Sequence, residues 1–362
     1  MNKRNRTRIL IVAIAMIALL SNGTRTAMAT SATDDALASL PAADAVLYVN
    51  VNLLLEDVLP RLFADNPAIF AELKKGLDDA KTSTGFDLSL IDTLAIGVRF
   101  NKDARQTPKV IVIARGRFDA AEVLVNANAK LKLNERFKTQ AYNNRTIYVE
   151  AAPKYNIAIA PLGADTFVSG DPQMVHDAID CNASAAGCAE NNLKTLAASN
   201  KDALFGYAGN NRATAVFAQM LLGLSSDLSK LAASVQEFNG SVSAPGNAAA
   251  LFLSARTETA EQAEGIAQLF ALMKQINESP DEVGAQKRPS MIPFVDGLNE
   301  LFLLFKGLSV TTEGSQVRFS VEIPFARIMK FMHPRSIANA PPPSPPRAAP
   351  PARATLRRSP RH

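Results

Sequence analysis

Two cysteines, Cys181 and Cys188, are the residues whose reactivity is best defined by their spacing. The residues between them, 182–187, are small enough to let the two sulfurs meet. In an oxidising compartment such a pair forms a disulfide. A zinc site would need four ligands, and His176 is the only histidine nearby. A redox-active pair usually has the spacing Cys-x-x-Cys. We therefore predict one local, structural disulfide.

Acid–base chemistry has few candidate residues in this chain. His176 is the one histidine between residues 30 and 332, and histidine is the commonest general base near neutral pH. Asp171 and Asp180 flank it, but these three residues do not share one face of a helix, so they do not predict a metal site. The chain also lacks Gly-x-Ser-x-Gly, a phosphate-binding glycine loop and His-Glu-x-x-His. We predict no catalytic, cofactor-binding or metal-binding residue, and a protein that is not an enzyme.

Two arginines, Arg115 and Arg256, occupy equivalent places in the two halves of the chain. Each directly follows an apolar run typical of a buried strand, Val110–Ala114 in one case and Leu251–Ala255 in the other. Two interpretations stay open. Each arginine is an ordinary charge at a strand end, or the two together line a cleft between the halves.

The N-terminal 29 residues predict a signal peptide. A basic start precedes the apolar residues 9–20, and the segment ends in Ala27-Met28-Ala29, which is typical of cleavage between Ala29 and Thr30. Twelve apolar residues rise only about 18 Å as a helix, whereas a bilayer core needs roughly 20 residues. Cleavage is the favoured interpretation, and retention as an N-terminal anchor is the alternative. Both predict an exported protein, periplasmic or extracellular, with envelope association left open.

Charge is unevenly distributed along the chain. The whole sequence has 39 basic and 34 acidic residues; residues 1–29 hold five of the bases, and residues 334–362 hold six arginines, with no acid in either segment. Residues 30–333 therefore carry 28 bases against 34 acids, a net charge of −6. Such an acidic body lacks the basic surface that nucleic acids need, so we predict no nucleic-acid partner.

The C-terminal residues 334–362 are rich in proline and arginine, and this composition predicts a disordered tail. Three roles stay open for it. It is a solvated spacer, it folds back onto the acidic body, or it contacts an anionic lipid or envelope polymer through Arg357, Arg358 and Arg361.

Repeated landmarks predict that the body is a doubled unit. Residues 44–50 are echoed by 202–208, and residues 110–122 by 251–261, where a strand ends in Ala-Arg before a helix. We expect an α+β fold of two tandem related units, each an antiparallel sheet with helices packed on one face. The expected parts are a flexible N-terminus (30–39), a first unit (40–182), a linker with the disulfide (183–201), a second unit (202–333) and the tail.

Hydrophobic periodicity and turn residues place the elements of both units. In the first unit we expect strands at 46–50, 94–100, 110–114, 137–141, 146–150, 156–160 and 166–169, and helices at 54–63, from Pro67, at 120–131 and at 172–179. In the second unit we expect strands at 251–256, 308–311 and 316–323, and helices within 216–235 and at 266–276, 294–305 and 325–331. Thr259 and Gln262 predict a capping box.

The run Leu40-Pro41-Ala42-Ala43-Asp44-Ala45, a helix pair ending at Thr84-Gly85-Phe86, and Ala114-Arg115-Gly116 before a helix resemble a group of exported bacterial cell-envelope proteins of unknown function. The resemblance implies an α+β repeat protein and assigns no catalytic residue.

The function expected from these observations is a non-enzymatic binding or scaffolding protein of the cell envelope, without a cofactor. Its partner would be an envelope protein, or an anionic polymer or lipid bound by the basic tail, and no transmembrane span would remain after cleavage. The alternative is a small-ligand carrier with a cleft between the two units.

Overall fold

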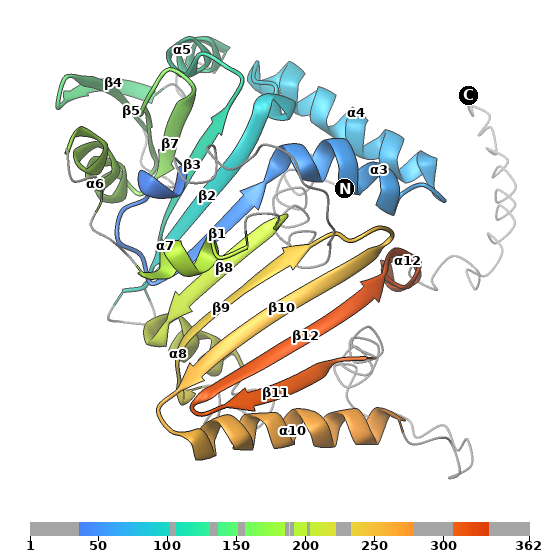
Figure 1. Ribbon diagram of the computed structural model, residues 1–362. Coiled ribbons are helices and arrows are strands. Elements are labelled where there is room, and N and C mark those ends of the chain that lie inside the picture. Colours follow the sequence, from blue (N-terminus) through green and yellow to red (C-terminus); the bar gives the residue numbers. More distant parts are fainter. Residues whose placement is uncertain are drawn as a thin grey trace, which may run out of the picture.

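A single antiparallel sheet organises the chain. The computed structural model describes residues 36–101, 106–130, 137–150, 156–184, 188, 192–200, 203–221, 233–278 and 307–332. Its twelve strands lie in the order β11-β12-β10-β9-β8-β1-β2-β3-β7-β6-β5-β4. Figure 1 shows how this order places the strands of the N-terminal half of the chain along one edge of the sheet and those of the C-terminal half along the other.

The N-terminal half contributes seven strands. They are β1 (Ala45–Asn50), β2 (Ile91–Arg99), β3 (Lys109–Gly116), β4 (Phe137–Tyr142), β5 (Arg145–Glu150), β6 (Ala158–Pro161) and β7 (Thr166–Gly170). Its helices are a π-helical turn (Leu53–Val58) that continues into α3 (Leu59–Leu62), then α4 (Pro67–Thr84), α5 (Ala120–Lys130), α6 (Pro172–Ala183) and α7 (Asn192–Ala197), with a 3-10 turn at Leu88–Leu90.

The C-terminal half contributes five strands, namely β8 (Phe205–Asn210), β9 (Val235–Ser243), β10 (Ala248–Thr257), β11 (Ser309–Glu313) and β12 (Gln316–Pro324). Its helices are α8 (Asn211–Leu221), α10 (Ala260–Glu278) and α12 (Phe325–Met332). The α+β class and the antiparallel pairing are confirmed, since every strand pair in the sheet is antiparallel.

Local sequence signals account for many of these elements. Asn143 and Asn144 both have positive φ, 45° and 59°, and so form the tight turn that the β4–β5 hairpin requires. The Asp171 carboxylate accepts hydrogen bonds from the backbone N–H groups of Gln173 and Met174 at the start of α6. The predicted capping box is also present, because Gln262 N–H donates to Thr259 Oγ1 (3.3 Å) while Thr259 N–H donates to Gln262 Oε1 (3.2 Å).

The two halves repeat the same pairing pattern. β2 and β9 are both nine residues long, and each lies between the first strand of its half and the strand that ends in Ala-Arg. Both hairpins also contain a bulge at the same place: the register slips between Ile91 and Thr93 opposite Arg115, and between Arg256 and Thr257. β1 pairs with β8, so the two expected units form one continuous sheet.

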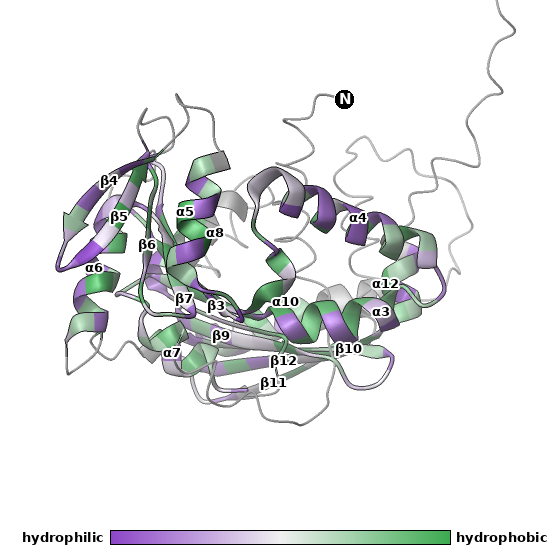
Figure 2. Cartoon of the chain, turned by 90° about the horizontal axis from the view of Figure 1, so that it is seen from above, coloured by the Kyte–Doolittle hydropathy of each residue, from purple (hydrophilic) through white to green (hydrophobic). Residues whose placement is uncertain are grey.

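Helices cover both faces of this sheet, whereas one covered face was expected. Val46 and Tyr48 of β1 belong to a core cluster with α6 and α7, while Val49 belongs to a second cluster with α3 and α12. Neighbouring strand residues point to opposite faces, so we call these the α6 face and the α4 face. Figure 2 shows α4, α8 and α10 on one side of the sheet. Both faces are covered because β1 carries apolar side chains on both of its sides, and each side must be buried.

Two further expectations need correction. Residues 30–39 were expected to be flexible, yet Ala36 and Leu37 are buried against the α6 face, because their apolar side chains complete the core there. Val235 was expected in a helix, but it opens strand β9. The periodicity missed β9 because Gly240 interrupts its apolar pattern, at a point where a Cβ atom would lie 2.3 Å from the Tyr207 hydroxyl.

Several predicted segments lie outside the described residues. They are the signal peptide with its cleavage site Ala29–Thr30, the helix expected at 294–305, and the tail with Arg357, Arg358 and Arg361. Within the described ranges, we find no helix with the length and apolar character that crossing a bilayer requires.

Candidate functional site

The candidate site is the part of the α6 face on strands β10, β12 and β11, where none of the described helices packs. Along β12, Val317, Phe319 and Val321 are buried on the α4 face, and the residues between them are exposed on the other side. Register extends this surface to the neighbouring strands. We call it the open face; its exposed residues are Phe252, Arg256, Ser309, Thr311, Glu313, Arg318, Ser320 and Glu322.

The same side of the sheet is closed over the N-terminal half. There α6, α7 and residues 36–43 pack on β1, β2 and β3. The covered part ends at β8 and β9, where α7 rests on Gly206 and the Asn200 amide donates to Ser241 Oγ (3.2 Å). In Figure 1, none of the described helices lies in front of β10 and β12, whereas α7 crosses β8. The two halves therefore share a fold but differ in which surface they leave free.

Phe252 is the apolar centre of the open face. The residue is 37 % exposed, and its direct neighbours across the two adjacent strands are Ser241 and Ser320. Serine side chains are too small to cover an aromatic ring, so the ring stands above its surroundings. On the opposite face, the Tyr207 hydroxyl donates to the Phe252 carbonyl oxygen (3.1 Å). Burial raises the pKa of Tyr207, which keeps this hydroxyl protonated as a donor.

Paired charges surround this aromatic centre. Arg256 Nε lies 3.8 Å from Glu237 Oε1, and Arg318 Nη2 lies 3.0 Å from Glu313 Oε2. Both arginines are about half exposed, so each pair contributes little to stability. These pairs form a polar rim around Phe252, whose charged side chains can instead pair with charges on another molecule.

The structure does not bring Arg115 and Arg256 together. Four strands, β9, β8, β1 and β2, lie between β10 and β3. Because each neighbouring pair is antiparallel, β3 and β10 run in opposite directions and their ends lie at opposite ends of the sheet. The halves meet through the backbone hydrogen bonds of β1 and β8.

Arg115 of β3 instead forms an ion pair with Asp165, in the loop before β7. Its Nε lies 2.9 Å from Asp165 Oδ2. Burial by itself would raise the pKa of Asp165, but hydrogen bonds from Thr166 and Arg115 outweigh it and lower this pKa below its usual value. The carboxylate form is therefore favoured in the folded state.

This lowered pKa predicts a pH dependence that the variant Asp165→Asn should lack. A carboxyl group with a lowered pKa in the folded state stabilises the protein above its unfolded pKa of about 3.9, and this contribution is lost as the pH falls through the folded value. At pH 6 the free energy of unfolding of the wild type should exceed that of the variant by at most about 1 kcal/mol, because Asp165 is partly exposed. Urea unfolding of both proteins at pH 6 and pH 3 measures this difference in unfolding free energy. A difference that grows towards pH 3 would contradict the lowered pKa of Asp165.

The predicted disulfide is confirmed, since Cys181 and Cys188 are bonded with their Cα atoms 4.4 Å apart. His176 packs against an aromatic neighbour. Its ring stacks on Tyr142 with 4.1 Å between centroids, and the Tyr142 hydroxyl donates to Asp180 (2.8 Å), which raises the Tyr142 pKa. Among the described residues, no group of three or more histidine, cysteine, aspartate or glutamate side chains is arranged to hold a metal ion.

The open face was missed at the sequence level, although one signal was present. Residues 316–323 alternate strictly between apolar and polar side chains, which is typical of a strand with one solvated side. The sequence could not show that the equivalent side of the first unit is covered.

Comparisons with known proteins add a likeness of fold. No family model matches the chain, and no curated protein matches it. Three crystal forms of the protein TP0453, forms I, III and IV, share 11–12 % sequence identity with it at TM-scores of 0.41–0.43. Each alignment covers 82–83 % of this chain and 95–97 % of that protein. This likeness concerns the α+β chain path alone.

Proposed function

We propose that this chain is an exported, non-enzymatic binding or scaffolding protein, and that it holds a protein partner on the open face. One observation carries the proposal. The same side of the sheet is closed by helices in the N-terminal half, whereas no described helix packs on it in the C-terminal half, where Phe252 is exposed among small polar residues. An exposed aromatic ring within a polar rim has the composition of a protein-binding site.

Export is supported by the disulfide between Cys181 and Cys188, because disulfides persist mainly outside the cytosol. The basic tail is a second proposed contact, with anionic lipid or polymer of the envelope through Arg357, Arg358 and Arg361. Deleting residues 335–362 tests this contact separately. Envelope fractionation that is unchanged at low and at high salt would remove the tail from the proposal.

Phe252→Ala is expected to weaken partner binding at least tenfold without unfolding the protein. Removing the ring takes away the apolar centre of the interface, and a tenfold loss corresponds to about 1.4 kcal/mol. The measurement is recovery of a partner identified by crosslinking to the wild-type protein in native envelopes.

Val125→Ala is the matched control, because Val125 is an exposed apolar side chain on α5, 55 % accessible. This control should bind that partner as the wild type does, and both variants should keep the wild-type midpoint of urea unfolding. Equal recovery with Phe252→Ala and wild type would rule out the open face as the binding site.

A further inference from the structure

The N-terminal residues 36–43, which we call the strap, complete the core on the α6 face. Leu40 is fully buried and Leu37 is 3 % exposed, both against residues of β1, β3, α6 and α7. Gly97 of β2 makes the necessary space, since a Cβ atom there would lie 3.2 Å from Leu40 Cδ1. Burying a leucine side chain contributes roughly 1.5–3 kcal/mol, so docking of the strap stabilises this part of the core.

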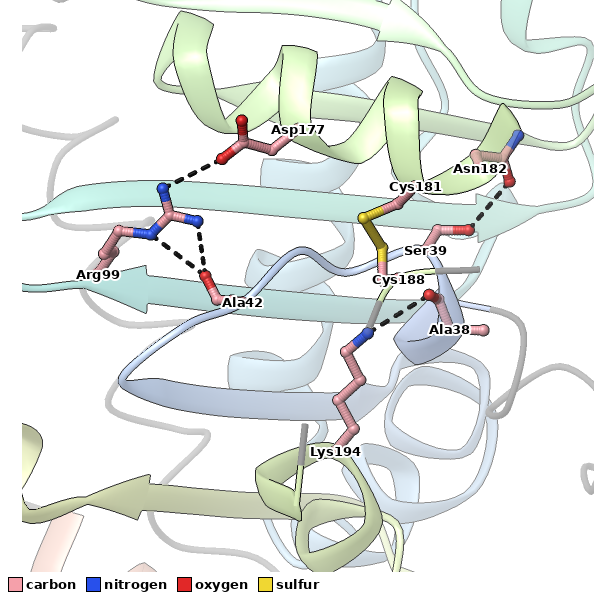
Figure 3. The surroundings of a disulfide bond; sticks show 9 residues. All are labelled: Ala38, Ser39, Ala42, Arg99, Asp177, Cys181, Asn182, Cys188 and Lys194. Carbon is pink, nitrogen blue, oxygen red and sulfur yellow. Dashed lines mark hydrogen bonds and ion pairs between the residues drawn. A yellow bond between two sulfur atoms is a disulfide. The ribbon is translucent and has the colours of Figure 1, made fainter. Parts of the chain in front are cut away.

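The strap lies between α6 and α7 and bonds to both (Figure 3). Ser39 Oγ donates to Asn182 Oδ1 in α6 (3.3 Å), and Lys194 Nζ of α7 donates to the Ala38 carbonyl oxygen (3.4 Å). Burial lowers the pKa of Lys194, as expected for a lysine packed against this segment. The position of the strap thus depends on α6 and α7 keeping their spacing.

The disulfide shortens the connection between these two helices. Cys181 belongs to the last turn of α6, next to Asn182, and Cys188 precedes the first residue of α7, Asn192, by four positions. α7 has only six residues, and a helix this short has little stability without tertiary contacts. The sulfur bridge holds Cys188, four positions before α7, against the last turn of α6.

We infer that the disulfide between Cys181 and Cys188 is a clasp that keeps the strap docked, so that breaking this bond opens the α6 face of the N-terminal half. A dithiol, free or on an oxidoreductase, supplies the reaction. Its thiolate attacks one sulfur, the second thiol resolves the mixed disulfide, and two electrons and two protons pass to the chain as two cysteine thiols while the dithiol becomes a disulfide. In the oxidised protein the strap is closed; in the reduced protein it exchanges with an open state.

Hydrogen exchange measured by mass spectrometry tests the clasp on the full mature chain. The variant Cys181→Ser/Cys188→Ser is compared with the oxidised wild type, and the reduced wild type serves as a second measurement of the same state. We expect amides of the strap and of α7 to exchange at least tenfold faster without the bond, and amides of β10 and β12 to keep their rates. Within the strap, the Leu40 N–H bonds to Leu37 O, and directly after it the Asp44 N–H bonds to Val98 O, so these two amides report on strap docking.

Leu40→Ala provides the reference rate for an open strap with the disulfide intact, because it removes the buried anchor and leaves both cysteines in place. Strap exchange in the double serine variant should approach this rate. Strap exchange that stays at the oxidised wild-type rate in the double serine variant overturns the inference. An equal acceleration of strap and of β10 and β12 also overturns it, because it would mean that the bond stabilises the whole fold rather than the strap.

Discussion

Gly206→Ala is expected to destabilise the protein by about 3 kcal/mol or more. A Cβ atom at position 206 would lie 1.9 Å from the carbonyl oxygen of Ala197, at the C-terminal end of α7. A backbone atom cannot turn aside as a side chain can, so α7 would have to move off β8. Such displacement in a packed region costs more than an ordinary surface substitution. The free energy of unfolding, measured in urea, gives the size of the effect.

Gly163→Ala is the matched control, since a Cβ atom there would lie no closer than 3.7 Å to its nearest neighbour, Asp165 Oδ1. This control should stay within about 0.5 kcal/mol of the wild type. If Gly206→Ala were as stable as Gly163→Ala, the packing of α7 against β8 would be refuted, and with it the boundary of the covered part of the α6 face.

Asp44→Ala should lower the free energy of unfolding by about 3 kcal/mol, because Asp44 connects the two halves of the sheet. It precedes β1 and is 8 % exposed. Its Oδ2 accepts a hydrogen bond from Phe100 N–H (2.8 Å), after β2, and its Oδ1 accepts one from Asn210 Nδ2 (3.0 Å), at the end of β8. Hydrogen bonds to a charged acceptor contribute about 1.5–3 kcal/mol each, and removing the carboxylate leaves both donors without it.

Asp44→Asn should have a smaller cost than Asp44→Ala, since its amide oxygen can still accept from one of the two donors. Asp57→Ala removes a carboxylate that pairs with Arg61 at the surface, where its side chain is 43 % exposed, and should cost less than about 1 kcal/mol. The unfolding free energies of the three variants, measured in one buffer, test whether the Asp44 carboxylate connects the two halves. A cost for Asp44→Ala no larger than that for Asp57→Ala would contradict a connecting role.

Much of the fold was predictable from local chemistry. The Asn143-Asn144 turn, the Asp171 cap and the Thr259–Gln262 capping box are settled by residues close in sequence, because hydrogen bonds and φ angles there depend on the immediate neighbours. The disulfide was predictable for the same reason, since a short chain links its two cysteines. Strand β9 was not predictable, because Gly240 interrupts its pattern to accommodate Tyr207 from the neighbouring strand.

The α+β class, the repeated order of strand and helix, and the pairing of Cys181 with Cys188 follow from local sequence patterns. Long-range contacts are what join β1 and β8 into one sheet, place Arg115 and Arg256 at opposite ends of it, and leave Phe252 exposed. The two groups of features differ because the forces that set them act over different distances along the chain. Turns, caps and periodicity act over a few residues, whereas which face of a strand is covered depends on segments more than a hundred residues away.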